Sequence, residues 1–432
     1  MNSVEKPSQL SAWMLNASIL LYIVWLMLPA VQATGHAATG VLAVALFCAG
    51  VLAGGPYTGR QWAWLLGSAA CTALMPLILR VFLQRGSEHF LGYYVQQAMF
   101  WLPLVFVAYA RMRGDRRLWR FVKWALLGCV ILTTLTTIGW LIEGMLRGGR
   151  IYAYARSLGF AGEGREAYLR ELMLRNIGGY DFIYAMVVAL PLTCISVQRH
   201  KAWARAGFVA LYAAQLAVIA LSQYTYAMLF AAAITVMEVM ALLMRKLSRG
   251  KMGMGASLLL GLVPLALAVL FMEPLVSLAS GLCAQLGLTN FAHSFDQLLL
   301  VLRGEATEEA ERFVHYQTAL RGFAASPLVG GMFSSDKLLS LHSEVLDLLA
   351  GLGLLGTAAV SGMMALMGRG SLAGVTKSPD RAQLCVMAVT LFACALLGTV
   401  FYSRDILAVA ALGTLLVLEG DGPSMASANA NP

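Results

Sequence analysis

A histidine at the entrance of an apolar segment is the residue best placed to do chemistry in this sequence. His342 ends a long polar stretch, and the residues after it are apolar at helical spacing, as at Val345 and Leu349. Because an imidazole exchanges protons near neutral pH, His342 could act on a substrate anchored in the bilayer beside it. Glu344 and Asp347 stand off the histidine's helical face, so they could raise its basicity or face a water-filled cavity.

Arginine is the second residue type with a suggestive distribution. The polar stretch 144–176 contains six arginines, three glutamates and no lysine, and 275–341 adds Arg303, Arg312 and Arg321. A planar guanidinium suits bidentate contact with phosphate oxygens better than an ammonium does. An arginine cluster is therefore what a lipid-linked diphosphate would need, because its leaving group gains negative charge as the bond to the sugar breaks.

A solvated ion-pair helix is the alternative for part of this cluster. Glu166 precedes Arg170 by four residues and Glu171 precedes Arg175 by four, which is the favourable order on a helix. For a single arginine the ion pair is the stronger interpretation. The pattern provides no such partner for Arg147, Arg150 and Arg156. The cluster as a whole therefore favours binding.

The composition of the chain predicts a membrane protein. Hydrophobic residues make up 59% of the chain, charged residues only 12%, and the mean hydropathy is +0.73, which excludes a soluble domain. Recurring apolar runs predict an all-α polytopic membrane protein with one membrane domain over 1–418 and a disordered cytoplasmic tail at 419–432. Twelve spans are expected, at 10–33, 36–54, 61–83, 94–110, 119–143, 177–197, 204–222, 224–244, 254–274, 342–367, 383–402 and 404–418.

Basic residues in the short connections predict the orientation. They cluster around 111–123, 199–205, 245–251 and 369–381, which all fall on the inner side if the N-terminus is cytoplasmic. Both termini then lie inside, and the long loops 144–176 and 275–341 lie outside. These topology determinants and their contact with membrane lipids explain the formal charge of +9, so no nucleic-acid partner is expected.

Motifs for metals, nucleotides and other cofactors do not occur. Six of the seven cysteines fall inside predicted spans, and neither a CxxC nor a Cys/His zinc spacing is present. The sequence also has no Asp-x-Asp, Walker loop, dinucleotide fingerprint, GxSxG or HExxH. We therefore expect chemistry without a metal or cofactor.

The segment around His342 also carries a pattern of residues at fixed spacing, with parallels in the loop before it. The positions that carry this pattern are His342, Ser343, Leu346, Gly353 and Gly356. They resemble the signature of the O-antigen ligase and polysaccharide polymerase superfamily, which has His-Asn, a Leu four residues after the His, and Gly-Leu-Leu-Gly; here Ser replaces the Asn. The stretches 312–319 and 326–330 resemble the family's Arg-aromatic-Ala and Pro-Leu-x-Gly patterns.

The resemblance implies a GT-C-like glycosyltransferase of the bacterial plasma membrane that acts in surface polysaccharide synthesis. Such an enzyme moves a glycan from polyprenyl diphosphate to a glycan, lipid-core or protein acceptor on the outer leaflet, without a metal. His342 would be the general base for the acceptor hydroxyl, and Arg312, Arg175 and Arg404 would hold the diphosphate. For Arg312 a surface position on an amphipathic helix is the equal alternative. Polymerase is slightly preferred to ligase, because it requires no outer-membrane lipopolysaccharide.

The chain departs from the family pattern after its seventh predicted span. The family has Ser-Arg there, whereas this chain has Ser222 and Gln223, followed by Tyr224. Glutamine donates hydrogen bonds but cannot neutralise charge. Gln223 and Tyr224 remain candidates for substrate binding, and either another arginine (Arg175 or Arg404) neutralises the diphosphate or the donor is handled differently.

Arg404 and Asp405, between the last two predicted spans, allow two interpretations. A simple ion pair that caps a tight turn is the first. In the second, Asp405 orients His342 or an arginine from behind.

Two other function classes stay open. A transporter or flippase for lipid-linked sugars would place ionisable residues along the membrane midplane, and Glu238 lies toward the inner end of its span. A non-catalytic scaffold for glycan assembly is favoured only if Gln223 reflects lost activity.

Overall fold

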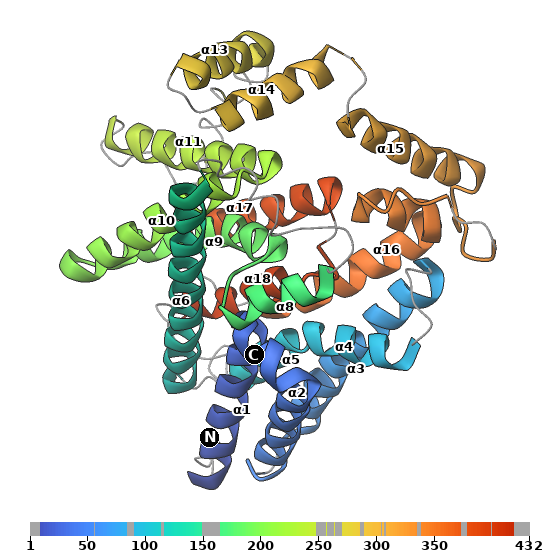
Figure 1. Cartoon of the computed structure of the whole chain (residues 1–432). Coiled ribbons are helices and arrows are strands. Elements are labelled where there is room, and N and C mark those ends of the chain that lie inside the picture. Colours follow the sequence, from blue (N-terminus) through green and yellow to red (C-terminus); the bar gives the residue numbers. More distant parts are fainter. Residues whose placement is uncertain are drawn as a thin grey trace.

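The protein is all-α in the computed structural model, which describes residues 9–55, 57–83, 90–113, 116–148, 165–247, 270–285, 289–303, 308–334, 338–372, 378–398 and 400–418 and positions 256, 263 and 305. No strand occurs among these residues. The helices (Figure 1) are α1 (Gln9–Met27), α2 (Pro29–Leu52), α3 (Gly59–Leu83), α4 (Phe90–Trp101), α5 (Pro103–Arg113), α6 (Arg116–Gly148), α8 (Arg165–Leu174), α9 (Tyr180–Arg199), α10 (Ala202–Ser222), α11 (Thr225–Leu247), α13 (Met272–Gln285), α14 (Thr289–Leu302), α15 (Glu308–Ala325), α16 (Glu344–Leu372), α17 (Ser378–Leu397) and α18 (Arg404–Leu418).

Eight described helices are long and apolar enough to cross a membrane, or nine spans if the bent pair Pro29–Gly35 and Ala38–Leu52 counts as one. The chain is therefore a multi-pass membrane protein, but the described residues do not reach the twelve predicted spans. The run 94–110 is interrupted at Leu102, where the following proline disfavours helical backbone. Helix α18 has only 15 residues. The predicted span 254–274 lies almost wholly outside the described residues, as does the tail 419–432.

Helix α9 is the centre of the bundle. Every residue from Phe182 to Thr193 is buried, as expected of a helix that is apolar on all faces. α9 packs against α10, α11, α17 and α18. In Figure 1 the blue and cyan helices α1–α5 lie below this centre, and α11, α13 and α14 lie above it.

The basic connections predicted for the inner side meet at one end of the bundle. Lys123 Nζ lies 3.3 Å from His200 Nε2, which joins the start of α6 to the α9–α10 connection. Arg199, at the end of α9, forms an ion pair with Asp380 in the first turn of α17. Three of the four basic connections therefore share one end, as their charges predicted. The side of a membrane that this end faces stays a prediction.

Both stretches predicted as outer loops contain helices. α6 continues to Gly148 and α8 follows, while 275–341 holds most of α13 and all of α14 and α15. Of the two ion pairs predicted for this stretch, the one between Glu171 in α8 and Arg175 just after it is observed among the described residues. α13 and α14 pack against each other, and the hydroxyl of Ser280 donates a hydrogen bond to Asp296 Oδ1 across them (2.6 Å).

Helix α16 is broken at Gly353, where φ is 63° and ψ is −169°. The break frees two backbone donors, and a preceding turn supplies their acceptors. The N–H of Leu354 donates to the carbonyl of Pro327 (2.8 Å), and the N–H of Leu355 to that of Leu328 (3.0 Å). A Cβ on Gly353 would lie 2.4 Å from the carbonyl of Leu328, so only glycine fits. The stretch 326–330, which carries the Pro-Leu-x-Gly pattern, thus contacts the patterned segment that follows His342.

Candidate functional site

A buried carboxylate holds the loop that carries His342. Asp347 accepts hydrogen bonds from the backbone N–H and the hydroxyl of Ser340 (2.6 and 2.7 Å) and from the N–H of Leu341 (3.1 Å). Ser340 and Asp347 are both fully buried. The Ser340 hydroxyl in turn accepts a hydrogen bond from the N–H of His342 (3.2 Å). Asp347 therefore determines where the histidine stands, a role that the sequence analysis did not assign to it.

His342 lies just ahead of α16, as the sequence predicted. Glu344 begins the helix, and Ser343 caps it, because its hydroxyl accepts a hydrogen bond from the N–H of Leu346 (3.2 Å). The half-buried imidazole faces α15, where the centroid of the His315 ring lies 5.0 Å away. His315 is exposed and was not among the predicted site residues.

Several helix ends meet beside this loop. The N–H of Glu344, which is fully buried, donates to the carbonyl of Gly398 just after α17 (3.0 Å). Gly398 lies next to Tyr180 at the start of α9, since a Cβ built on it would be 3.9 Å from the phenol oxygen. The Tyr180 ring packs edge-on against Tyr224 at the start of α11 (centroids 4.9 Å apart). The predicted site residues Glu344 and Tyr224 are thus brought to the same end of the bundle.

The start of α18 adds charge at this end. Ser403 caps the helix by accepting a hydrogen bond from the N–H of Ile406 (3.3 Å). Arg404 Nε lies 3.5 Å from Asp405 Oδ1, and Asp181 in the first turn of α9 interacts electrostatically with both. Asp405 is buried, whereas the Arg404 side chain keeps 24% of its surface exposed. One arginine thus faces two carboxylates and still reaches the surface. Asp181 is a residue that the predicted site lacked.

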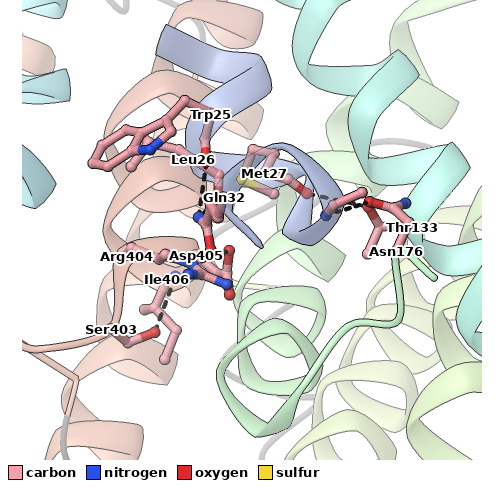
Figure 2. A network of polar contacts seen from close by, with 11 residues as sticks. Trp25, Leu26, Met27, Gln32, Thr133, Asn176, Ser403, Arg404, Asp405 and Ile406 are labelled. Carbon is pink, nitrogen blue, oxygen red and sulfur yellow. Dashed lines mark hydrogen bonds and ion pairs between the residues drawn. The ribbon is translucent and has the colours of Figure 1, made fainter. Parts of the chain in front are cut away.

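Asn176 joins α6 to the break between α1 and α2. Its amide donates to Thr133 Oγ1 (3.1 Å), and the Thr133 hydroxyl donates to the carbonyl of Met27 (3.1 Å). On the other side of the break, the amide of Gln32 donates to the carbonyls of Trp25 and Leu26 (2.8 and 3.1 Å). Figure 2 shows these contacts together with Arg404 and Asp405, and α1 packs against α18. The helix before the break thus lies against the helix that begins with Arg404 and Asp405.

The arginines of the predicted outer loops are less free than the sequence suggested. Arg175 Nη2 lies 2.6 Å from Glu171 Oε1, with both side chains more than half exposed. Arg147 was expected to have no such partner, but it pairs with Glu143 at 2.5 Å, because α6 continues past the predicted loop boundary. Arg312 falls in α15, and its side chain lies outside the described residues.

Gln223 caps the C-terminus of α10 in the left-handed conformation, with φ 56° and ψ 26°. The residue is only 8% exposed. Neither its amide nitrogen nor its amide oxygen has a hydrogen-bond partner among the described residues. The next residue is Tyr224, whose ring packs against Tyr180 and, at 6.5 Å, Tyr184. Gln223 is therefore a buried amide that precedes, in the chain, a member of a cluster of three tyrosines.

No three His, Cys, Asp or Glu side chains gather so as to hold a metal ion in the part of the chain that the structure describes. No model of a known protein family and no curated protein matches the sequence. The fold and the site therefore define a class by architecture: a multi-pass α-helical membrane protein with a polar, partly charged site where several helix ends meet.

Proposed function

We propose that the protein is a membrane glycosyltransferase of the O-antigen ligase and polysaccharide polymerase type, with a GT-C-like architecture, in the bacterial plasma membrane. It transfers a glycan from polyprenyl diphosphate to a hydroxyl group on a second glycan at the outer leaflet. The observation that supports this proposal is the meeting of helix ends that carry the His342 loop, the Tyr180–Tyr224 pair and Arg404. They provide a base, rings on which a sugar face can pack, and a cation for diphosphate.

His342 is the general base in this reaction. The acceptor oxygen bonds to C1 of the donor's first sugar, and the bond between C1 and the diphosphate oxygen breaks. The electron pair leaves with the diphosphate, and the imidazole of His342 takes the proton of the acceptor hydroxyl. Asp347 acts as a positioning residue, because it holds the loop through Ser340 and Leu341.

Arg404 is the guanidinium best placed to offset the charge of the leaving diphosphate. It lies at the start of α18 beside buried Asp405 and remains partly exposed. Because Asp405 and Asp181 already balance part of its charge, a second cation is required. Arg175 and Arg312 are the candidates, and Arg175 would have to exchange Glu171 for phosphate oxygens.

The test is transfer by the purified protein. Wild type and His342→Ala are each incubated in EDTA with polyprenyl diphosphate-linked oligosaccharide, and glycan length is read on a gel. A ladder from wild type alone supports a polymerase that uses His342. Transfer that occurs only when a lipid-core or protein acceptor is added supports a ligase instead.

His293→Ala is the matched control, because His293 is an exposed histidine on α14. It should transfer glycan as wild type does. Equal activity of wild type and His342→Ala would remove the histidine from the mechanism. No transfer under either condition would overturn the proposal and favour the transporter or scaffold.

A further inference from the structure

Gln223 has the properties of a ligand-binding residue. Its amide is buried and has no hydrogen-bond partner in the part of the chain that the structure describes, which is costly because both donor and acceptor have lost water. The backbone adds strain, because a non-glycine residue at φ 56° is uncommon. The left-handed backbone ends α10, but the fold gains nothing from the unpaired amide, whereas a binding site can use a preformed donor and acceptor pair.

The surroundings of Gln223 match a sugar better than a diphosphate. Its chain neighbour Tyr224 belongs to the tyrosine cluster, in which Tyr180 and Tyr184 also pack ring to ring at 4.7 Å. Arg404 and Asp405 lie at the start of α18, and Asp181 follows Tyr180 in the first turn of α9. Aromatic faces pack against the apolar faces of sugar rings, and a neutral amide cannot neutralise phosphate charge.

The amide also limits which sugar groups it can bind. Its oxygen accepts one hydrogen bond and its NH₂ group donates, from adjacent positions in one plane. Two neighbouring hydroxyl groups on a sugar ring present a matching pair, with one hydroxyl donating and the other accepting. An isolated hydroxyl group would pair with either the oxygen or the NH₂ group of the amide and leave the other without a hydrogen bond.

We propose that Gln223 and the Tyr180–Tyr224 pair form a subsite that binds a vicinal pair of hydroxyl groups on the donor sugar attached to diphosphate. This inference rests on the proposed function for the identity of the donor. It gives Gln223 a task different from charge neutralisation, which falls to Arg404. Because the amide is out of contact with solvent, a neighbouring side chain must move when the sugar enters.

Binding of defined probes tests the subsite without any transfer reaction. The full chain in lipid nanodiscs is titrated with short-chain polyprenyl diphosphate that carries glucose, 3-deoxyglucose, 6-deoxyglucose or no sugar. Removal of the 3-hydroxyl destroys every vicinal pair on the ring, whereas removal of the 6-hydroxyl leaves them all. In wild type we expect 3-deoxyglucose to bind about tenfold more weakly than glucose, and 6-deoxyglucose to match glucose.

Gln223→Leu should bind the glucose probe about tenfold more weakly than wild type does, and should no longer distinguish it from the 3-deoxy probe. Its affinity for the probe without sugar should be unchanged. Gln215→Leu, which removes another buried glutamine from α10, is the control and should behave as wild type. Equal loss with the sugar-free probe would assign Gln223 to the diphosphate and overturn the proposal.

Stability separates this role from a structural one. Replacement of an unsatisfied buried amide by leucine should leave the unfolding midpoint of the ligand-free protein unchanged or raise it. A lower midpoint for Gln223→Leu would mean that the amide supports the fold, and would contradict the proposal. If wild type does not bind the glucose probe, galactose and mannose probes replace it, and failure to bind any of the three would also contradict the proposal. Selective sugar binding without glycan transfer would keep the subsite and overturn only the proposed function.

Discussion

The carboxylate of Asp347 accepts hydrogen bonds from both the backbone N–H and the hydroxyl of Ser340, at 2.6 and 2.7 Å. The two residues are seven positions apart, and His342 stands between them. The Asp347 side chain, in the first turn of α16, therefore binds the backbone of the loop that precedes the helix. These hydrogen bonds account for a buried carboxylate at the entrance of an apolar helix.

Asp347→Ala should destabilise the protein and reduce glycan transfer together. The change leaves the N–H groups of Ser340 and Leu341 without their acceptor, which costs about 3 kcal/mol in the free energy of unfolding. Unfolding in mixed detergent micelles measures the loss. Asp296→Ala is the control: Asp296 accepts a hydrogen bond from Ser280 but is exposed, so its loss should cost less than about 1 kcal/mol. Equal costs for the two variants would contradict the positioning role.

Gly353→Ala should be among the most damaging single changes in α16. The new methyl group would meet the carbonyl of Leu328 at 2.4 Å, and the backbone there has φ 63°. We expect a loss of at least about 3 kcal/mol in unfolding free energy. Gly362 lies in the same helix with nothing within 4 Å of a Cβ, so Gly362→Ala should be neutral or stabilising by up to about 1 kcal/mol. A Gly353→Ala variant as stable as wild type would show that α16 and its partner turn can separate.

The features that were predicted correctly from the sequence depend on local residue patterns. Hydropathy predicted the helical membrane class, the histidine position predicted the entrance of α16, and the charges of Glu171 and Arg175 predicted an ion pair on a helix. Each of these depends on residues within a few turns of one another. The number of spans stays a prediction, since the described residues hold eight or nine, and an apolar run such as 94–110 does not reveal its interruption.

Contacts between distant segments could not be predicted in this way. The left-handed Gly353 has a partner 25 residues earlier in Leu328, and Asp181 meets Arg404 only because α9 and α18 pack together. The composition of a loop also did not show that α13 and α14 would form within it. Pairing across such separations depends on tertiary packing, which periodicity does not encode.

Asn176 provides a test of backbone strain at the charged end of the bundle. It has φ 58°, and its amide donates to Thr133. Asn176→Ala loses the hydrogen bond and keeps the strained backbone, so it should cost about 2 kcal/mol in unfolding free energy. Asn176→Gly loses the same hydrogen bond but adopts positive φ readily, and should cost about 1 kcal/mol. If the two variants are equally stable, the backbone at this position carries no strain.

The ion pair between Arg199 and Asp380 should couple α9 to α17 strongly, because both side chains are largely buried, with 16% and 7% of their surface exposed. Arg199→Met or Asp380→Leu alone leaves one buried charge without its partner and should cost about 3 kcal/mol in unfolding free energy. The double variant should cost clearly less than the sum, with a coupling of about 2 kcal/mol. The pair of Arg303 with Glu273, half exposed on both sides, is the control and should show a coupling below about 1 kcal/mol. Equal coupling in the two cycles would show that burial does not strengthen the Arg199–Asp380 pair.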